Sequence, residues 1–82
     1  YSTEFISILE NLPKDIPVYT NSIPTLPFLA KRDNMFYQQN NIYELNNKYG
    51  YFVVNNKYEK RDIKYCEITY RWENYYICKR KK

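Results

Sequence analysis

The chain is short, and its composition excludes several classes of protein. Its 82 residues suffice for one small domain. The formal charge is +4, but residues 79–82 supply four of the 13 cations and the other nine equal the nine acids in number, so a broad basic face is not expected. The single glycine excludes glycine-rich phosphate loops and dinucleotide fingerprints.

Residues 1–13 are expected to form an amphipathic helix. Apolar side chains recur there at the spacing of one helical face, at Phe5, Ile8, Leu9 and Leu12. Pro13 predicts the end of the helix. A helix of this length is marginal in water by itself, so the apolar face is expected to pack across a sheet.

Residues 14–33 contain three of the four prolines, at positions 17, 24 and 27. Each proline restricts the residue before it to extended geometry. The segment is therefore predicted to be an extended crossover that connects the helix to the sheet.

Residues 34–80 are expected to form the strands, because β-branched and aromatic runs alternate there with asparagine-rich turns. The predicted strands are MFYQQ (35–39), NIYEL (41–45), YFVVN (51–55), IKYCEITYRW (63–72) and YYICK (75–79). Gly50 closes one of the turns, where a positive φ angle is expected. A helix from Asp33 to Tyr49 is the competing interpretation, although its asparagines favour turns.

The predicted fold class is α+β, with the N-terminal helix packed on a four- to five-stranded, mainly antiparallel sheet. One domain spans residues 1–82, and residues 79–82, Lys-Arg-Lys-Lys, are expected to form a basic tail. No apolar run approaches the roughly 18 residues that a membrane-spanning helix needs.

The two cysteines lie in the last predicted hairpin. A loop of about five residues from Tyr70 to Asn74 would set Cys66 across from Cys78, on the same face as Trp72. Two interpretations remain: a cross-strand disulfide, which favours an oxidising compartment outside the cytoplasm, or buried thiols that act as small apolar groups. Two cysteines without histidine do not make a structural zinc site, and no metal or cofactor is predicted.

Catalysis is not expected, because the absence of histidine removes the commonest general acid or base. The function predicted from the sequence is binding to another protein through a tyrosine-rich sheet face or an edge strand. The alternative is a single-stranded nucleic-acid-binding module that uses the same aromatic face and the C-terminal tail. The candidate binding residues, expected on the face opposite the cysteines or beside it, are Tyr65, Arg71, Tyr75, Lys79 and Arg80.

Overall fold

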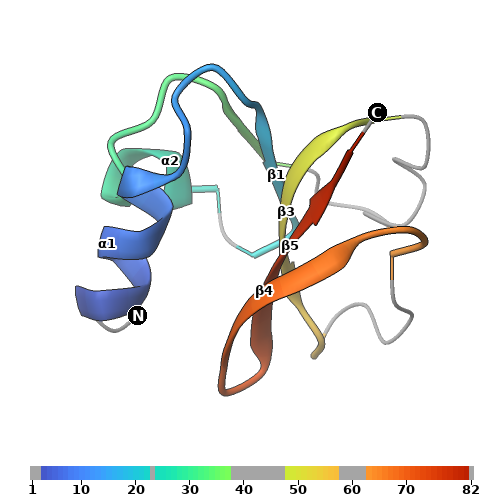
Figure 1. Cartoon of the computed structure of the whole chain (residues 1–82). Helices are drawn as coiled ribbons and strands as arrows, with labels where there is room; N and C mark the ends of the chain where they lie inside the picture. Colours follow the sequence, from blue (N-terminus) through green and yellow to red (C-terminus); the bar gives the residue numbers. More distant parts are fainter. Residues whose placement is uncertain (1–2, 23, 38–47, 58–62, 82) are drawn as a thin grey trace.

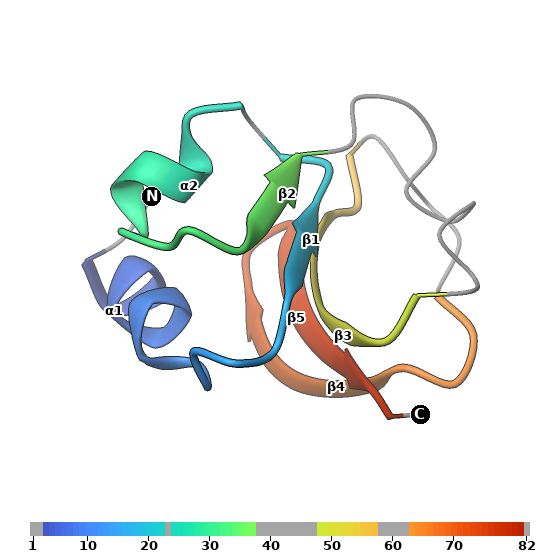
Figure 2. The same ribbon diagram turned by 90° about the horizontal axis from the view of Figure 1, so that it is seen from above.

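The computed structural model describes residues 3–22, 24–37, 48–57 and 63–81. Its elements in chain order are α1 (Thr3–Asn11), β1 (Val18–Thr20), α2 (Leu26–Leu29), β2 (Met35–Tyr37), β3 (Gly50–Asn55), β4 (Glu67–Trp72) and β5 (Tyr75–Arg80). The strands form one sheet in the order β2-β1-β3-β5-β4. Figures 1 and 2 show a curved sheet with both helices on one side of it, so the α+β class is confirmed.

Helix α1 packs on the sheet as its apolar spacing predicts. Phe5 and Leu9 are completely buried, one turn apart on the inner face of the helix. Phe5 stacks on Trp72 at 5.4 Å between ring centroids, which joins the helix to β4. Because nine residues do not hold a helix in water by themselves, this contact with the sheet is what stabilises α1.

The sheet is mixed, and the prediction of a mainly antiparallel sheet is wrong for the half that contains β1. Strand β1 is parallel to both of its neighbours, so that Val18 pairs with Met35 on one side and with Tyr51 on the other. Backbone hydrogen bonds next to the start of β1 belong to the same pairing with β2 and β3. The Val18 N–H donates to the Asn34 carbonyl, and the Tyr51 N–H donates to the Pro17 carbonyl, each at 3.0 Å. Parallel pairing is a contact between distant segments and leaves no turn signal in the sequence.

The segment 14–33 also differs from its prediction, because it contains strand β1, which lies between β2 and β3, and the short helix α2 as well as extended chain. Pro27 lies in the first turn of α2, where a proline is tolerated since its missing N–H has no helical partner there. The predicted strand 35–39 is confirmed over Met35–Tyr37. The predicted strand 41–45 lies outside the described residues, as does most of the alternative helix.

Gly50, the first residue of β3, lies directly against Pro17, the residue before β1. Its φ angle is +140°, so the predicted positive φ is confirmed. A Cβ atom at this position would overlap the carbonyl oxygen of Pro17 and lie 3.2 Å from the Cγ of the same proline. The glycine therefore serves the packing of two strands in addition to the turn.

The antiparallel half of the sheet contains a bulge that changes which side chains share a face. Ile68 pairs with Cys78, but the next pair is Tyr70 with Ile77, so Thr69 is the extra residue in β4. Cys66 and Ile68 therefore pack on one face, whereas Tyr70 and Trp72 pack on the other. The prediction that Cys66 and Trp72 share a face is wrong, because it assumed strict alternation along the strand.

The turn of this hairpin is also tighter than predicted. Trp72 pairs with Tyr75, which leaves only Glu73 and Asn74 between the strands, and Glu73 adopts a φ of +51°. The two cysteines nevertheless form a disulfide, with an S–S distance of 2.02 Å. Cys66 lies two residues before Ile68, the register partner of Cys78, so the bond connects the segment before β4 to the centre of β5.

Apolar side chains cover both faces of the sheet. On the helix face, Phe5, Leu9 and Leu26 pack against Val53 and Ile77. The other face, which we call the disulfide face, has a smaller cluster built on Phe52, Val54, Tyr76 and Cys78, with Ile63 and Cys66 packed over it. The sheet is thus a central layer, which explains why all six residues of β3 are buried.

Candidate functional site

The five residues predicted to bind a partner are not gathered on one surface. Tyr75 lies on the helix face, where its ring is 5.6 Å from that of Phe5. Lys79 lies on that face too, 5.5 Å above the ring of Tyr51. The face opposite the cysteines is therefore largely covered by α1 and does not present the expected row of tyrosines to solvent.

Arg71 and Arg80 lie on the disulfide face. The Arg71 guanidinium is 5.8 Å from the ring of Tyr76, its register partner in β5. The Arg80 guanidinium is 4.9 Å from the ring of Phe52, and only 4% of the residue is exposed. The bulge at Thr69 contributes to this separation, because it reverses the faces of the residues that follow it in β4.

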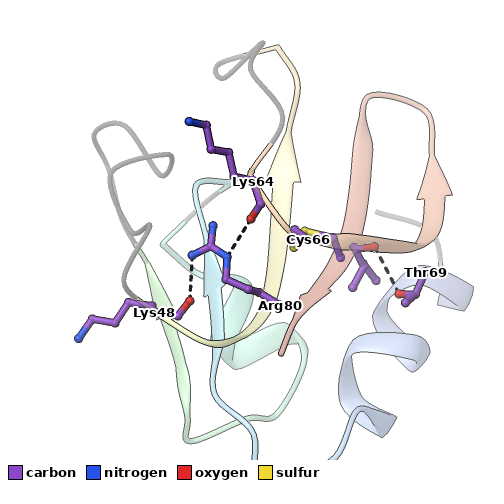
Figure 3. Close-up of a disulfide and its surroundings, with 7 residues drawn as sticks. Lys48, Lys64, Cys66, Thr69 and Arg80 are labelled. Atoms are coloured by element: carbon purple, nitrogen blue, oxygen red, sulfur yellow. Dashed lines mark hydrogen bonds between the residues drawn. A yellow bond between two sulfur atoms is a disulfide. The ribbon is translucent and has the colours of Figure 1, made fainter. Parts of the chain in front are cut away.

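Arg80 is a structural residue and not part of a basic tail. Its Nε donates to the carbonyl oxygen of Lys64 at 3.0 Å, and its Nη1 donates to the carbonyl oxygen of Lys48 at 2.9 Å (Figure 3). Since Lys79 and Arg80 both belong to β5, the prediction of a tail over residues 79–82 is wrong for its first half. Lys81 is exposed, and Lys82 lies outside the described residues.

By binding these two carbonyls, Arg80 brings together two Lys–Tyr pairs that are distant in the sequence. Lys48 and Tyr49 directly precede β3. Lys64 and Tyr65 lie just before β4, separated from it by Cys66. Both lysines are exposed, and the exposed fractions of Tyr49 and Tyr65 are 46% and 93%. We call these four residues the Lys–Tyr surface.

The backbone holds Tyr65 in an unusual position. Its φ angle is +59°, in the left-handed region that bulky residues rarely adopt and that costs about 1–3 kcal/mol. The residue before it is held by the hydrogen bond to Arg80, and the residue after it is held by the disulfide. These two attachments impose the conformation and leave the tyrosine ring in solvent.

Among the described residues, Arg32 and Tyr70 have shifted pKa values, and both belong to the packing of α1. Burial lowers the pKa of the Arg32 guanidinium, which donates four hydrogen bonds to backbone carbonyls, although the nearby Tyr51 acts in the opposite direction. Burial is also the main reason that the pKa of Tyr70 is raised, and its hydrogen bond to the Glu4 carboxylate raises it further. Neither group lies on the Lys–Tyr surface.

The described residues contain neither a group of metal ligands nor a membrane-spanning helix. Within residues 3–22, 24–37, 48–57 and 63–81, no three acidic, cysteine or histidine side chains are grouped so as to hold a metal ion. No helix in the same ranges is long and apolar enough to cross a membrane.

Comparison of the chain with protein-family models, with curated proteins and with solved structures found no match. The Lys–Tyr surface is therefore identified by the exposure, charge and backbone geometry of this chain's own residues.

Sequence reasoning selected Tyr65 but missed Lys48 and Tyr49. The available signal was the Lys-Tyr dipeptide, which occurs at 48–49, 57–58 and 64–65. The first occurrence precedes a predicted strand by one residue and the last lies within one, so the repeat alone does not single out these two pairs. What the sequence does not show is that the two dipeptides meet. That depends on Arg80, which the sequence analysis named as a candidate binding residue at the border of the last strand and the basic tail.

Proposed function

We propose that this chain is a non-enzymatic binding module that takes up an acidic segment of another protein on the Lys–Tyr surface. The observation that carries the proposal is Tyr65, an aromatic side chain that is 93% exposed and held in a left-handed conformation. Strained backbone clusters at functional sites, and tyrosine is enriched in the interfaces between proteins.

The ring of Tyr65 is suited to be the anchor of an interface. Tyrosine is enriched among the residues that contribute most to protein binding, because it offers a large contact area and loses little side-chain entropy. The hydrogen bond between Arg80 and the Lys64 carbonyl fixes the neighbouring backbone before any partner arrives. Such preorganisation reduces the entropic cost of association.

The charges on the surface favour an acidic partner. The Lys48 and Lys64 side chains extend into solvent on either side of the Arg80 guanidinium, as Figure 3 shows. Exposed cations of this kind steer an oppositely charged segment to the site and contribute more to association rate than to affinity. Arg80 binds the backbone carbonyls of both lysines and not their side chains, which are exposed.

The other surfaces named in the sequence analysis are less suitable. Much of the helix face of the sheet is packed under α1. Among the described strands, β2 and β4 are outermost. Strand β2 has only three residues, and β4 has a bulge flanked by the exposed Glu67 and Arg71, all features that natural proteins use to protect edges from pairing.

Binding of a single-stranded nucleic acid is the second candidate, and the combination of Tyr49 and Tyr65 with two lysines favours it. Aromatic rings stack on bases and lysines contact phosphates in such modules. We rank it second because the cations outside residues 79–82 are balanced by acids over the whole chain, whereas nucleic-acid binders usually have a broad basic face.

The test compares two fluorescent probes, a short oligoglutamate peptide and an oligothymidylate of similar length, by fluorescence anisotropy over a series of salt concentrations. The proposal predicts saturable binding of the peptide. Tyr65→Ala should weaken it by about tenfold, the effect of losing an interface anchor worth about 1.4 kcal/mol. A stronger interaction with the oligothymidylate, declining steeply with salt, would favour the second candidate instead.

The matched control is Phe28→Ala. Phe28 is 83% exposed, but it lies on α2, and Figures 1 and 2 place α2 on the opposite side of the sheet from the segment before β4. Removing this ring should leave both affinities unchanged. Equal affinities of wild type and Tyr65→Ala for the peptide would refute the proposal.

A further inference from the structure

The segment Ile63–Cys66, which carries half of the Lys–Tyr surface, is attached to the sheet at three points. Ile63 is buried in the cluster on the disulfide face. The Lys64 carbonyl accepts the hydrogen bond from Arg80 Nε at 3.0 Å. Cys66 is bonded to Cys78. The last attachment is the only covalent one of the three.

The two sulfur atoms lie in different environments. Cys78 is completely buried in β5, where its register partners are Phe52 in β3 and Ile68 in β4. Cys66 is half-buried at the start of the hairpin, beside the fully exposed part of the segment. A reductant therefore approaches the disulfide from the side of Cys66.

We propose that the Cys66–Cys78 disulfide is a redox-sensitive attachment whose reduction releases the segment and disables the Lys–Tyr surface. The inference rests on the proposed function, because it concerns regulation of the same surface. The reductant is a dithiol. One of its thiolates attacks Sγ of Cys66, the S–S bond breaks, and Cys78 leaves as a thiolate that takes up a proton. The second thiol of the reductant then displaces Cys66, which becomes a thiol, and the reductant ends as an intramolecular disulfide.

Relief of the backbone strain at Tyr65 favours the released state of the segment once the disulfide is reduced. The left-handed φ of this residue is unfavourable for a tyrosine and persists only while both of its neighbours are fixed. Without the disulfide, relaxation of Tyr65 moves the Lys64 carbonyl away from Arg80, and the two Lys–Tyr pairs are no longer held together. Binding that depends on both pairs then declines.

The sheet itself is expected to survive reduction. Strand β5 pairs with β3 over six residues, from Gly50 with Arg80 to Asn55 with Tyr75, and with β4 on its other side. These ladders and the core on the helix face do not include Cys66. The change is thus predicted to be local, as partial openings of native proteins often are.

The experiment measures oxidised protein, protein reduced with dithiothreitol, and the double variant Cys66→Ser/Cys78→Ser. NMR follows hydrogen exchange at Arg80 Nε–H and at the backbone amide of Val53 in β3. Anisotropy follows the oligoglutamate peptide. We expect exchange at Arg80 Nε–H to accelerate by about tenfold or more on reduction, protection at Val53 to persist, and peptide affinity to decrease by about tenfold. The double variant should behave as the reduced chain does.

Three results would overturn the inference: unchanged protection of Arg80 Nε–H in the reduced chain, unchanged peptide affinity despite faster exchange, or loss of protection at Val53 in both the reduced chain and the double variant. Absence of peptide binding in every redox state overturns the proposed function as well. That failure is distinguishable, because the exchange of Arg80 Nε–H is measured without any ligand.

Discussion

The substitution Arg32→Met tests whether one buried cation holds α1 in place. The Arg32 guanidinium donates to the carbonyl oxygens of Leu9 (3.2 Å), Leu12 (2.8 Å), Pro13 (2.9 Å) and Ile16 (3.1 Å). Leu9 lies in the last turn of α1, and Leu12 directly follows the helix. Three of these carbonyls also have a second donor: Leu9 accepts from the Leu12 N–H, Pro13 from the Ile16 N–H, and Ile16 from Asn34 Nδ2. Methionine has a similar length and supplies no donor, so all four carbonyls lose this partner.

The loss of stability follows from the strength of these four bonds. A hydrogen bond to a charged group contributes about 1.5–3 kcal/mol, so four give roughly 6–12 kcal/mol. The variant no longer buries a charge, which offsets several kcal/mol of that sum. The loss is reduced further because the Leu9, Pro13 and Ile16 carbonyls keep a second donor, and because three of the four bonds are only partly buried. We therefore expect a net loss of about 3 kcal/mol, out of a total stability of roughly 4–12 kcal/mol for a chain of this length.

The assay is urea unfolding followed by the fluorescence of Trp72, the single tryptophan, which stacks on Phe5 of α1 and so reports on helix docking. A loss of about 3 kcal/mol also lowers Tm by roughly 12–24 °C in a domain of this size. The control is Lys31→Met, which removes a charge from the adjacent exposed residue and should change stability by less than about 0.5 kcal/mol. If the two variants were equally stable, Arg32 would not act through these carbonyls.

Two further substitutions test single contacts. Gly50→Ala should lower stability by roughly 2–5 kcal/mol, because it combines an unfavourable φ with overlap against Pro17; a loss below about 1 kcal/mol in urea unfolding would contradict this packing. Glu4→Gln should lower the raised pKa of Tyr70 without abolishing the shift, since burial is its larger cause. The stability that this raised pKa contributes is present below the pKa of the unfolded chain and is lost as the pH rises through the folded pKa. Tyrosine Cζ shifts in an NMR titration measure it, and Glu10→Gln, on the same helix, should leave them unchanged.

Local patterns were sufficient for those elements whose signals lie within a few residues. The spacing of Phe5 and Leu9 predicted α1 and its buried face, because a helix places residues four apart on the same side. The apolar run at residues 51–55 predicted β3, and the aromatic run at residues 75–79 predicted β5.

Prediction failed where a contact joins distant segments. Strand β1 has only three residues and stands among prolines, so no local signal distinguished it from extended chain. Its parallel ladder forms because β2 and β3, which follow it in the sequence, pair with it on its two sides. The bulge at Thr69 also has no local signal. Its effect is seen in the packing, where Cys66 lies on one face of the sheet and Trp72 on the other.

The sequence by itself determined the fold class, the N-terminal helix, the longer strands and the proximity of the two cysteines, because each depends on spacing along the chain. Only the tertiary structure decided the parallel half of the sheet, the covering of the predicted tyrosine face and the roles of Arg32 and Arg80. Each of these depends on a contact between segments that are distant in the sequence, and the two arginines show this most clearly. A buried guanidinium binds whichever backbone carbonyls the folded chain brings to it, and the positions of those carbonyls are not encoded near the arginine.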